Sequence, residues 1–163
     1  MKLLIVANLE STARKSAPQT PGLRILTKAH VRKIKMATPK MEIIVTGDPD
    51  EIARHVVDAD IIVTSPRTLP PLAQARSLKW IHSLSAGVDR LLTPEVKKSP
   101  ILISNSSGVH AIPIAEHVLA YMLIFARGFL SSLENQKKRL WQRGTDLTEL
   151  YEKTVLIVGM GNI

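Results

Sequence analysis

Short apolar runs alternate with amphipathic stretches over residues 1–104. The runs are too short and too uniformly apolar for half-exposed antiparallel strands, so they predict buried strands. These strands are expected at 2–7, 41–46, 60–64, 78–84 and 100–104. Helical spacing fills the intervals at about 22–37, 49–58, 69–76 and 88–98. Strict alternation of strands and helices predicts an α/β fold with a doubly wound parallel sheet covered on both faces.

Two of the predicted helices carry start signals. The run Asp48-Pro49-Asp50-Glu51 places acidic residues in a first turn, where they favour the helix dipole. The run Thr93-Pro94-Glu95 does the same and places proline at the first helical position. Both runs therefore predict where a helix begins.

A different pattern begins at Ile112. Apolar residues recur at three- and four-residue intervals up to Arg139, which predicts one long amphipathic helix that Gly128 only weakens. A polar link then leads to a predicted strand at 154–158. We therefore expect a first domain over residues 1–104. Residues 105–163 are expected to form a crossover helix and the first strand of a second, incomplete domain.

The net charge of +8 is concentrated near the N-terminus, where residues 1–40 hold nine Lys or Arg and one acidic residue, Glu10. The basic residues at helical spacing are Arg24, Lys28, Arg32 and Lys35. This spacing predicts a solvated helix face. No aromatic residue is interleaved to stack on bases, so nucleic-acid binding is not expected.

The absence of cysteine excludes disulfides, thiolate zinc sites and a cysteine nucleophile. The longest apolar run, 118–126, is too short to span a membrane. The N-terminal run turns polar at Asn8 and does not resemble a signal peptide. A cytoplasmic location is expected.

The predicted strand at 154–158 runs into Gly159-Met160-Gly161-Asn162-Ile163. Strand followed by Gly-x-Gly-x-x is the opening of a dinucleotide-binding fingerprint, in which the glycines permit a tight turn and close approach of the pyrophosphate. The third glycine would be residue 164, so the sequence is expected to stop inside this loop. Taken alone, an ordinary strand-to-helix turn explains the two glycines equally well.

A second candidate lies at the carboxyl end of the strand at 78–84, where small residues culminate in Gly87. Ligands of open α/β sheets bind at this edge, and exposed backbone amides there can hold a carboxylate. An ordinary turn glycine is the alternative for Gly87. Asp89 is expected to cap the next helix.

A third candidate is the polar link that leads into the helix at Ile112. It contains His110, which lies outside the helix and is expected to face a ligand. Glu116 and His117 are expected to be buried polar residues that anchor the helix. These three residues lack the spacing His-Glu-x-x-His, so no metal site is expected.

Taken in order, several segments resemble the D-isomer-specific 2-hydroxyacid dehydrogenases. They are Leu78–Ile81, Ser85–Asp89, Asn105–His110, Ile114–Ala120, and Lys153–Val155 leading into Gly159–Ile163. The resemblance covers residues 60–163, whereas the first 50 residues match only in their βαβ pattern.

The resemblance implies a flavodoxin-like substrate domain over residues 1–104 and the beginning of a Rossmann-type cofactor domain, with the active site between them. The implied substrate-binding residues are Ala86, Gly87, His110 and, more weakly, Ser65. The implied cofactor-binding residues are Ala86, Ile114, Gly159, Met160, Gly161, Asn162 and Ile163. The family's catalytic histidine, acidic residue and arginine would follow residue 163, so no catalytic residue is assigned.

We therefore expect the N-terminal part of an oxidoreductase that transfers hydride between NAD or NADP and a small D-2-hydroxy or 2-oxo acid. The 163-residue piece is expected to be inactive and to form a homodimer through the crossover helix region. A non-enzymatic binding or regulatory module that uses the basic helix remains the alternative. Another acceptor, such as phosphonate, also stays open.

Overall fold

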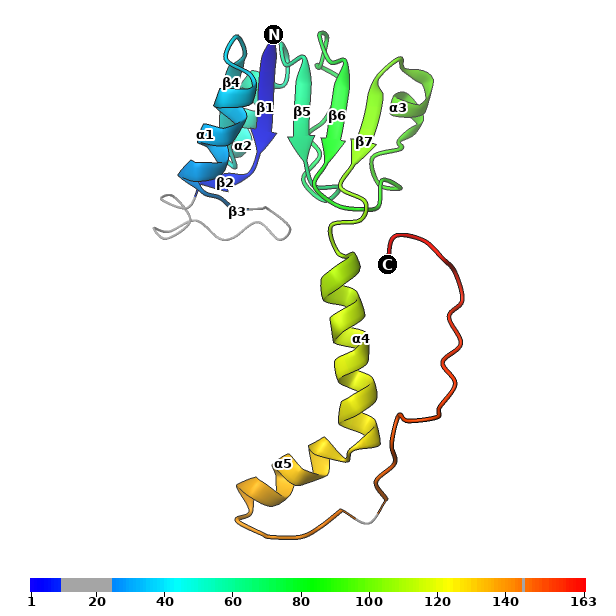
Figure 1. The fold of residues 1–163 in the computed structure, drawn as a ribbon. Helices are drawn as coiled ribbons and strands as arrows, with labels where there is room; N and C mark the ends of the chain where they lie inside the picture. The colour runs from blue at the N-terminus through cyan, green and yellow to red at the C-terminus, as the bar shows by residue number, and fades with distance from the viewer. Residues whose placement is uncertain (10–24, 145) are drawn as a thin grey trace. The chain divides into compact units, whose positions relative to one another are not determined.

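The computed structural model describes residues 1–9, 25–144 and 146–163. Its main sheet has five parallel strands in the order β4-β1-β5-β6-β7 (Figure 1). They are β1 (Lys2–Val6), β4 (Glu42–Thr46), β5 (Ile61–Thr64), β6 (Trp80–Ser83) and β7 (Leu102–Asn105). Numbered along the chain within this sheet, the order is 2-1-3-4-5, the order of flavodoxin-like folds. The predicted α/β class and parallel sheet are confirmed.

Three helices flank this sheet: α1 (Lys28–Ala37), α2 (Pro49–His55) and α3 (Pro94–Lys98). The first amides of these helices donate to the side chains of Thr27, Asp48 and Thr93, respectively. Such caps satisfy amides that have no partner within the helix. The two start signals identified in the sequence are therefore confirmed for α2 and α3.

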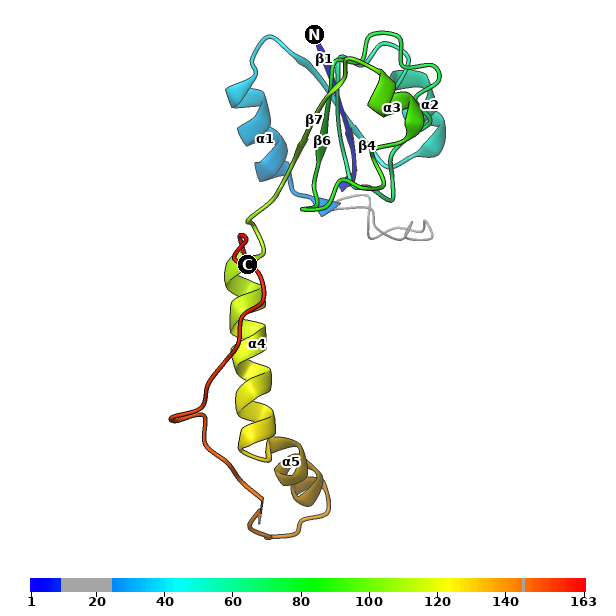
Figure 2. The same cartoon turned by 90° about the vertical axis from the view of Figure 1, so that its right-hand side faces the viewer.

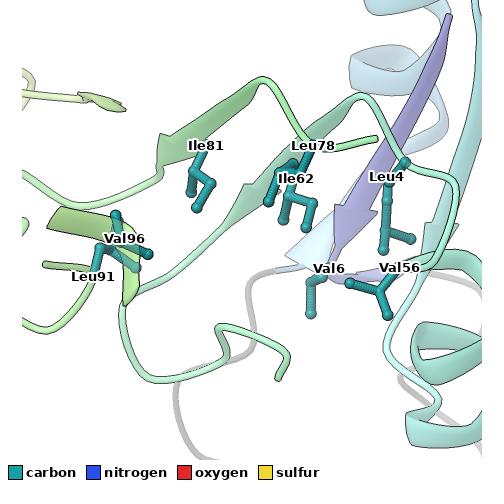
Figure 3. Close-up of a cluster of buried hydrophobic side chains, with 9 residues drawn as sticks. Leu4, Val6, Val56, Ile62, Leu78, Ile81, Leu91 and Val96 are labelled. Atoms are coloured by element: carbon teal, nitrogen blue, oxygen red, sulfur yellow. The ribbon is translucent and has the colours of Figure 1, made fainter. Parts of the chain in front are cut away.

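Apolar side chains at alternate strand positions form one core on each face of the sheet. Leu4, Ile62 and Ile81 are fully buried on the face that packs against α2 and α3 (Figure 3). On the opposite face, Ile5 is buried and Ile34 of α1 packs against its cluster. Figure 2 shows α1 on one side of the sheet and both α2 and α3 on the other. The doubly wound arrangement is confirmed.

Two helix predictions are wrong. Residues 69–76 form no helix, because Pro70 and Pro71 have no amide hydrogen to donate and their rings obstruct the preceding turn. The helix predicted at 88–98 is confined to α3, and residues 89–91 form a turn. Asp89 therefore does not cap a helix.

A short parallel pair, β2 (Asn8–Leu9) with β3 (Ile25–Leu26), lies outside the main sheet. β3 occupies two positions of the helix predicted at 22–37, so that prediction is wrong at these residues. α1 begins at Lys28, inside the predicted helix at 22–37. Residues 22–24 of that prediction, including Arg24, lie outside the described residues.

The chain divides into two compact units, Met1–Ser107 and Gly108–Ile163. The second unit contains α4 (Ala111–Ala126) and α5 (Phe129–Lys137). Across the described residues, no single helix combines the length and apolar content needed to cross a membrane. α4 and α5 meet that test only as a pair, and a 67° bend separates them.

The single helix predicted over 112–139 is wrong, because the helix breaks at Gly128. This residue adopts a left-handed conformation with φ of 58°, which residues other than glycine rarely adopt. A Cβ at this position would lie only 2.7 Å from Leu147 Cδ2. Gly128 therefore ends one helix and starts the next.

The strand predicted at 154–158 is absent. These residues have no regular structure, and Leu156 and Val158 are 85% and 91% exposed. A β-strand is stabilised by hydrogen bonds to a neighbouring strand, and no strand pairs with this segment among the described residues. The beginning of a Rossmann-type sheet is therefore not formed in this structure.

Candidate functional site

The loop after β6, residues 85–87, is held by donors that all bind its carbonyl oxygens. Asn105 Nδ2 donates to the Ala86 carbonyl at 2.7 Å, and the Ser106 amide donates to the Ser85 carbonyl at 3.3 Å. Ser83 Oγ lies 3.0 Å from the Ser85 carbonyl and 3.4 Å from that of Gly87. The carbonyl oxygens of the loop are thus turned toward the ends of β6 and β7.

Because the carbonyl oxygens of the loop point toward their donors, the N–H groups of the same three peptide units point away from them. In a trans peptide the N–H points opposite to the preceding carbonyl, so the amides of Ala86, Gly87 and Val88 face outward. Within the described part of the chain, none of these amides donates to another group. Ala86 and Gly87 are exposed. Successive free amides form a site for an anion, and a carboxylate fits such a site.

Gly87 is not required here by backbone strain. It is not among the glycines with positive φ, and a Cβ on it would meet Asp89 Oδ2 at an ordinary contact distance of 3.7 Å. What glycine provides is open access to its amide. The prediction that small residues leave exposed amides at this edge therefore has a physical basis in the loop.

Ser65 lies in a turn beside this loop, since the Leu84 amide donates to the Thr64 carbonyl at 2.8 Å. The Thr68 amide donates to the Ser65 carbonyl at 3.0 Å, and the hydroxyls of Ser65 and Thr68 are 2.9 Å apart. Ser65 is 5% exposed. Its hydroxyl stabilises the turn, and Arg67, which is exposed, lies at the tip of the turn.

The remaining substrate and helix candidates lie in the second unit. His110 is the N-cap residue of α4, and its side chain makes no capping hydrogen bond. Ile114 is 37% exposed. Glu116 and His117 are exposed, so the prediction that they are buried is wrong. The His117 ring contacts Tyr121 edge to face.

The five cofactor candidates at the C-terminus also lie in the second unit. Gly159 has φ of 103°, which suits a tight glycine turn, and no atom lies within 4 Å of a Cβ built on Gly159 or Gly161. Met160 and Ile163 are 99% and 68% exposed, and Asn162 lies beside Gly108.

These residues do not fit a dinucleotide by themselves. The fingerprint needs a paired strand before the glycines and a helix N-terminus after them, and the described residues provide neither at this position. Among the described residues, no three potential metal ligands cluster either.

The sequence analysis did not identify three residues whose hydrogen bonds hold the loop: Ser83, Asn105 and Ser106. Asn105 and Ser106 were visible as a polar run at the end of a predicted strand. Their role depends on β7 lying beside β6, which a sequence pattern does not specify.

Comparison with known proteins shows which family this sequence matches. The family described as D-isomer specific 2-hydroxyacid dehydrogenase, catalytic domain, matches residues 14–155. A D-3-phosphoglycerate dehydrogenase from Synechocystis is 31% identical over 144 residues, which are 87% of this chain and 25% of that protein. A formate dehydrogenase from Candida boidinii is 28% identical over 127 residues, or 72% of this chain and 35% of that protein.

Solved structures agree with this assignment. A D-isomer specific 2-hydroxyacid dehydrogenase family protein from Aeromonas salmonicida superposes with a TM-score of 0.68 and 25% identity, covering 89% of this chain and 42% of that one. The chain thus spans about a quarter to under half of the length of these relatives. The match to the family extends over most of the sequence, and the chain belongs to the D-isomer-specific 2-hydroxyacid dehydrogenase family.

Proposed function

We propose that this chain provides the substrate-binding domain of an oxidoreductase that transfers hydride between NAD or NADP and a small D-2-hydroxy or 2-oxo acid. The observation that carries the proposal is the set of three outward amides, at Ala86, Gly87 and Val88. Their role is to bind the substrate carboxylate and so to orient the neighbouring carbon for hydride transfer.

The relatives support a carboxylate as the recognised group. The names of the two kinds of relative refer to phosphoglycerate and formate, which differ in size but share a carboxylate. A loop that offers only backbone amides recognises this shared group without requiring a particular side chain on the substrate. The remainder of the substrate is then selected elsewhere.

The other predicted residues have distinct roles in this proposal. The family resemblance assigns His110 and Ser65 to substrate binding, and within the first unit Ser65 stabilises the turn beside the loop. The family resemblance assigns Ala86, Ile114 and residues 159–163 to contacts with a nicotinamide cofactor. The 163-residue chain binds carboxylates without turnover, and it forms a homodimer through the region of α4.

The proposal is tested by titrating the ¹⁵N-labelled 163-residue chain with glyoxylate and following its amide resonances. The amides of Ala86, Gly87 and Val88 are expected to shift together. Glycolamide, which is similar in size but uncharged, serves as the control ligand. Equal shifts with both compounds, or no shift with glyoxylate, would contradict carboxylate binding at this loop.

A second assay tests the activity of the natural gene product. Its intact mass is measured first, and NADH or NADPH oxidation is then followed with glyoxylate, hydroxypyruvate and pyruvate. Turnover of one of these acids is expected of the natural gene product. A natural product that binds the acids but oxidises neither cofactor would contradict the dehydrogenase assignment for this protein.

A further inference from the structure

Four side chains on β6, β7 and the loop after β7 form a continuous hydrogen-bonded chain. Trp80 Nε1 donates to Ser104 Oγ at 2.7 Å, and Ser104 Oγ lies 2.9 Å from His82 Nδ1. On the other side of the ring, His82 Nε2 lies 3.2 Å from Ser106 Oγ. Ser106 Oγ in turn donates to the Ser83 carbonyl at 3.0 Å. These hydrogen bonds thus connect Trp80, the first residue of β6, with Ser106 beyond the end of β7.

The hydroxyl protons fix the direction of every bond. Ser106 has one hydroxyl proton, which it donates to the Ser83 carbonyl, so His82 Nε2 must be the donor to Ser106 Oγ. In the neutral ring, His82 Nδ1 then carries a lone pair and accepts from the Ser104 hydroxyl. Ser104 Oγ accepts from Trp80 Nε1 and uses its own proton for the bond to Nδ1. A neutral His82 with its proton on Nε2 satisfies all four side chains.

This series of hydrogen bonds ends at Ser106, which also holds the loop at 85–87. The Ser106 amide donates to the Ser85 carbonyl, and that carbonyl belongs to the same peptide unit as the Ala86 amide. A shift or rotation of Ser106 would therefore turn the first of the outward amides. Asn105 fixes the next peptide unit from the other face of β7.

We propose that His82 is a positioning residue, which together with Trp80, Ser104 and Ser106 holds the loop at 85–87 in the orientation that binds the substrate carboxylate. This inference rests on the proposed function of the loop. Histidine suits the position because one ring nitrogen accepts and the other donates, so a single rigid side chain joins two hydroxyls. No other step of the reaction is assigned to these residues.

The test compares two substitutions of His82 in the 163-residue chain. His82→Phe keeps a planar ring and removes both hydrogen bonds, whereas His82→Gln retains an amide donor that can reach Ser106. Glyoxylate affinity, measured from the Gly87 amide, is expected to weaken about tenfold in His82→Phe and to be largely restored in His82→Gln. Leu102→Ala, on the same sheet face and 62% exposed, is the matched control and should leave the affinity unchanged.

Two further measurements distinguish a positioning role of His82 from a loss of protein stability and from a failure of the loop to bind the ligand. The ¹⁵N spectrum of the His82 ring is expected to show the proton on Nε2. Wild-type affinity in His82→Phe, or a proton confined to Nδ1, would overturn the proposal. If glyoxylate shifts no amide even in the wild type, the proposed function fails. The positioning proposal is then tested by the ring spectrum and by the effect of His82→Phe in the absence of ligand. This substitution should displace the amide resonances of Ala86 and Ser106. Unchanged resonances would overturn the positioning proposal.

Discussion

Replacing Asn105 by aspartate tests whether the loop binds an anion through its amides. The Asn105 amide donates to the Ala86 carbonyl at 2.7 Å, and aspartate would replace this donor with a charged acceptor. Loss of the hydrogen bond costs about 1 kcal/mol of binding free energy if the loop must be held to bind. The new charge adds a repulsive contribution, because it lies on the opposite side of one peptide unit from the bound carboxylate.

The size of the repulsion follows from this geometry. With the new carboxylate in the place of the Asn105 amide, one peptide unit and the hydrogen bond to the bound anion lie between the charges, which are then roughly 8 Å apart. Coulomb's law then gives about 0.5 kcal/mol in water and about 2 kcal/mol at an effective dielectric constant of about 20. Since the loop is exposed, we take the combined effect as about 2 kcal/mol, which is roughly a thirtyfold loss of affinity.

The assay is the glyoxylate titration at low and at high salt, with Asn105→Ala as the matched control. The alanine variant loses only the hydrogen bond, so its affinity should fall about fivefold and respond to salt as the wild type does. The added penalty of Asn105→Asp should shrink at high salt, because exposed charges are screened. Equal losses in both variants would refute the electrostatic reasoning, and no loss in either would refute the binding loop itself.

Three other predictions concern stability and association. Leu4→Ala should lower the free energy of unfolding by about 2–5 kcal/mol in urea titrations because Leu4 is fully buried, whereas Leu102→Ala at an exposed site should cost less than about 0.5 kcal/mol. Hydrogen bonds from Lys79 and the Lys2 amide hold the pKa of Asp60 below its usual 3.8, so their contribution is present above that pH and is lost as the pH falls through the folded pKa. Asp60→Asn should therefore show a smaller drop in the urea midpoint between pH 7 and pH 3 than the wild type. Glutamate at both Leu119 and Phe125, which are 57% and 71% exposed, should give a monomer in sedimentation; an unchanged mass would contradict dimerisation through α4.

The strands were predictable because their burial leaves a direct mark on the sequence. β5 is apolar at three successive positions, as expected of a strand covered on both faces. The segment at 69–76 shows the limit of the same reasoning. Leu69, Leu72 and Ala75 pack against the core at helix-like intervals, so the pattern reported burial correctly. The two prolines decided the conformation.

The candidate site was predictable to the level of the loop and no further. Gly87 and Ala86 were identified because small residues at the carboxyl edge of a parallel strand are a local signal. Asn105 and His82 were not identified because their hydrogen bonds cross from one strand to its neighbour. Such partners follow only from the strand order and the register, which places His82 opposite Ser104.

The two units differ in whether their apolar residues are buried, and this difference explains the remaining wrong predictions. In Met1–Ser107, each predicted strand has a neighbour and the apolar side chains form two buried clusters. In Gly108–Ile163, α4 has no buried residue and the apolar run at 154–158 is exposed. A sequence pattern records the environment in which a segment is buried, and a strand needs a neighbour before its pattern can become structure. The pattern at 154–158 therefore fits a strand that has no neighbour among the described residues. The amides at 86–88, by contrast, are already set in place by donors within the first unit.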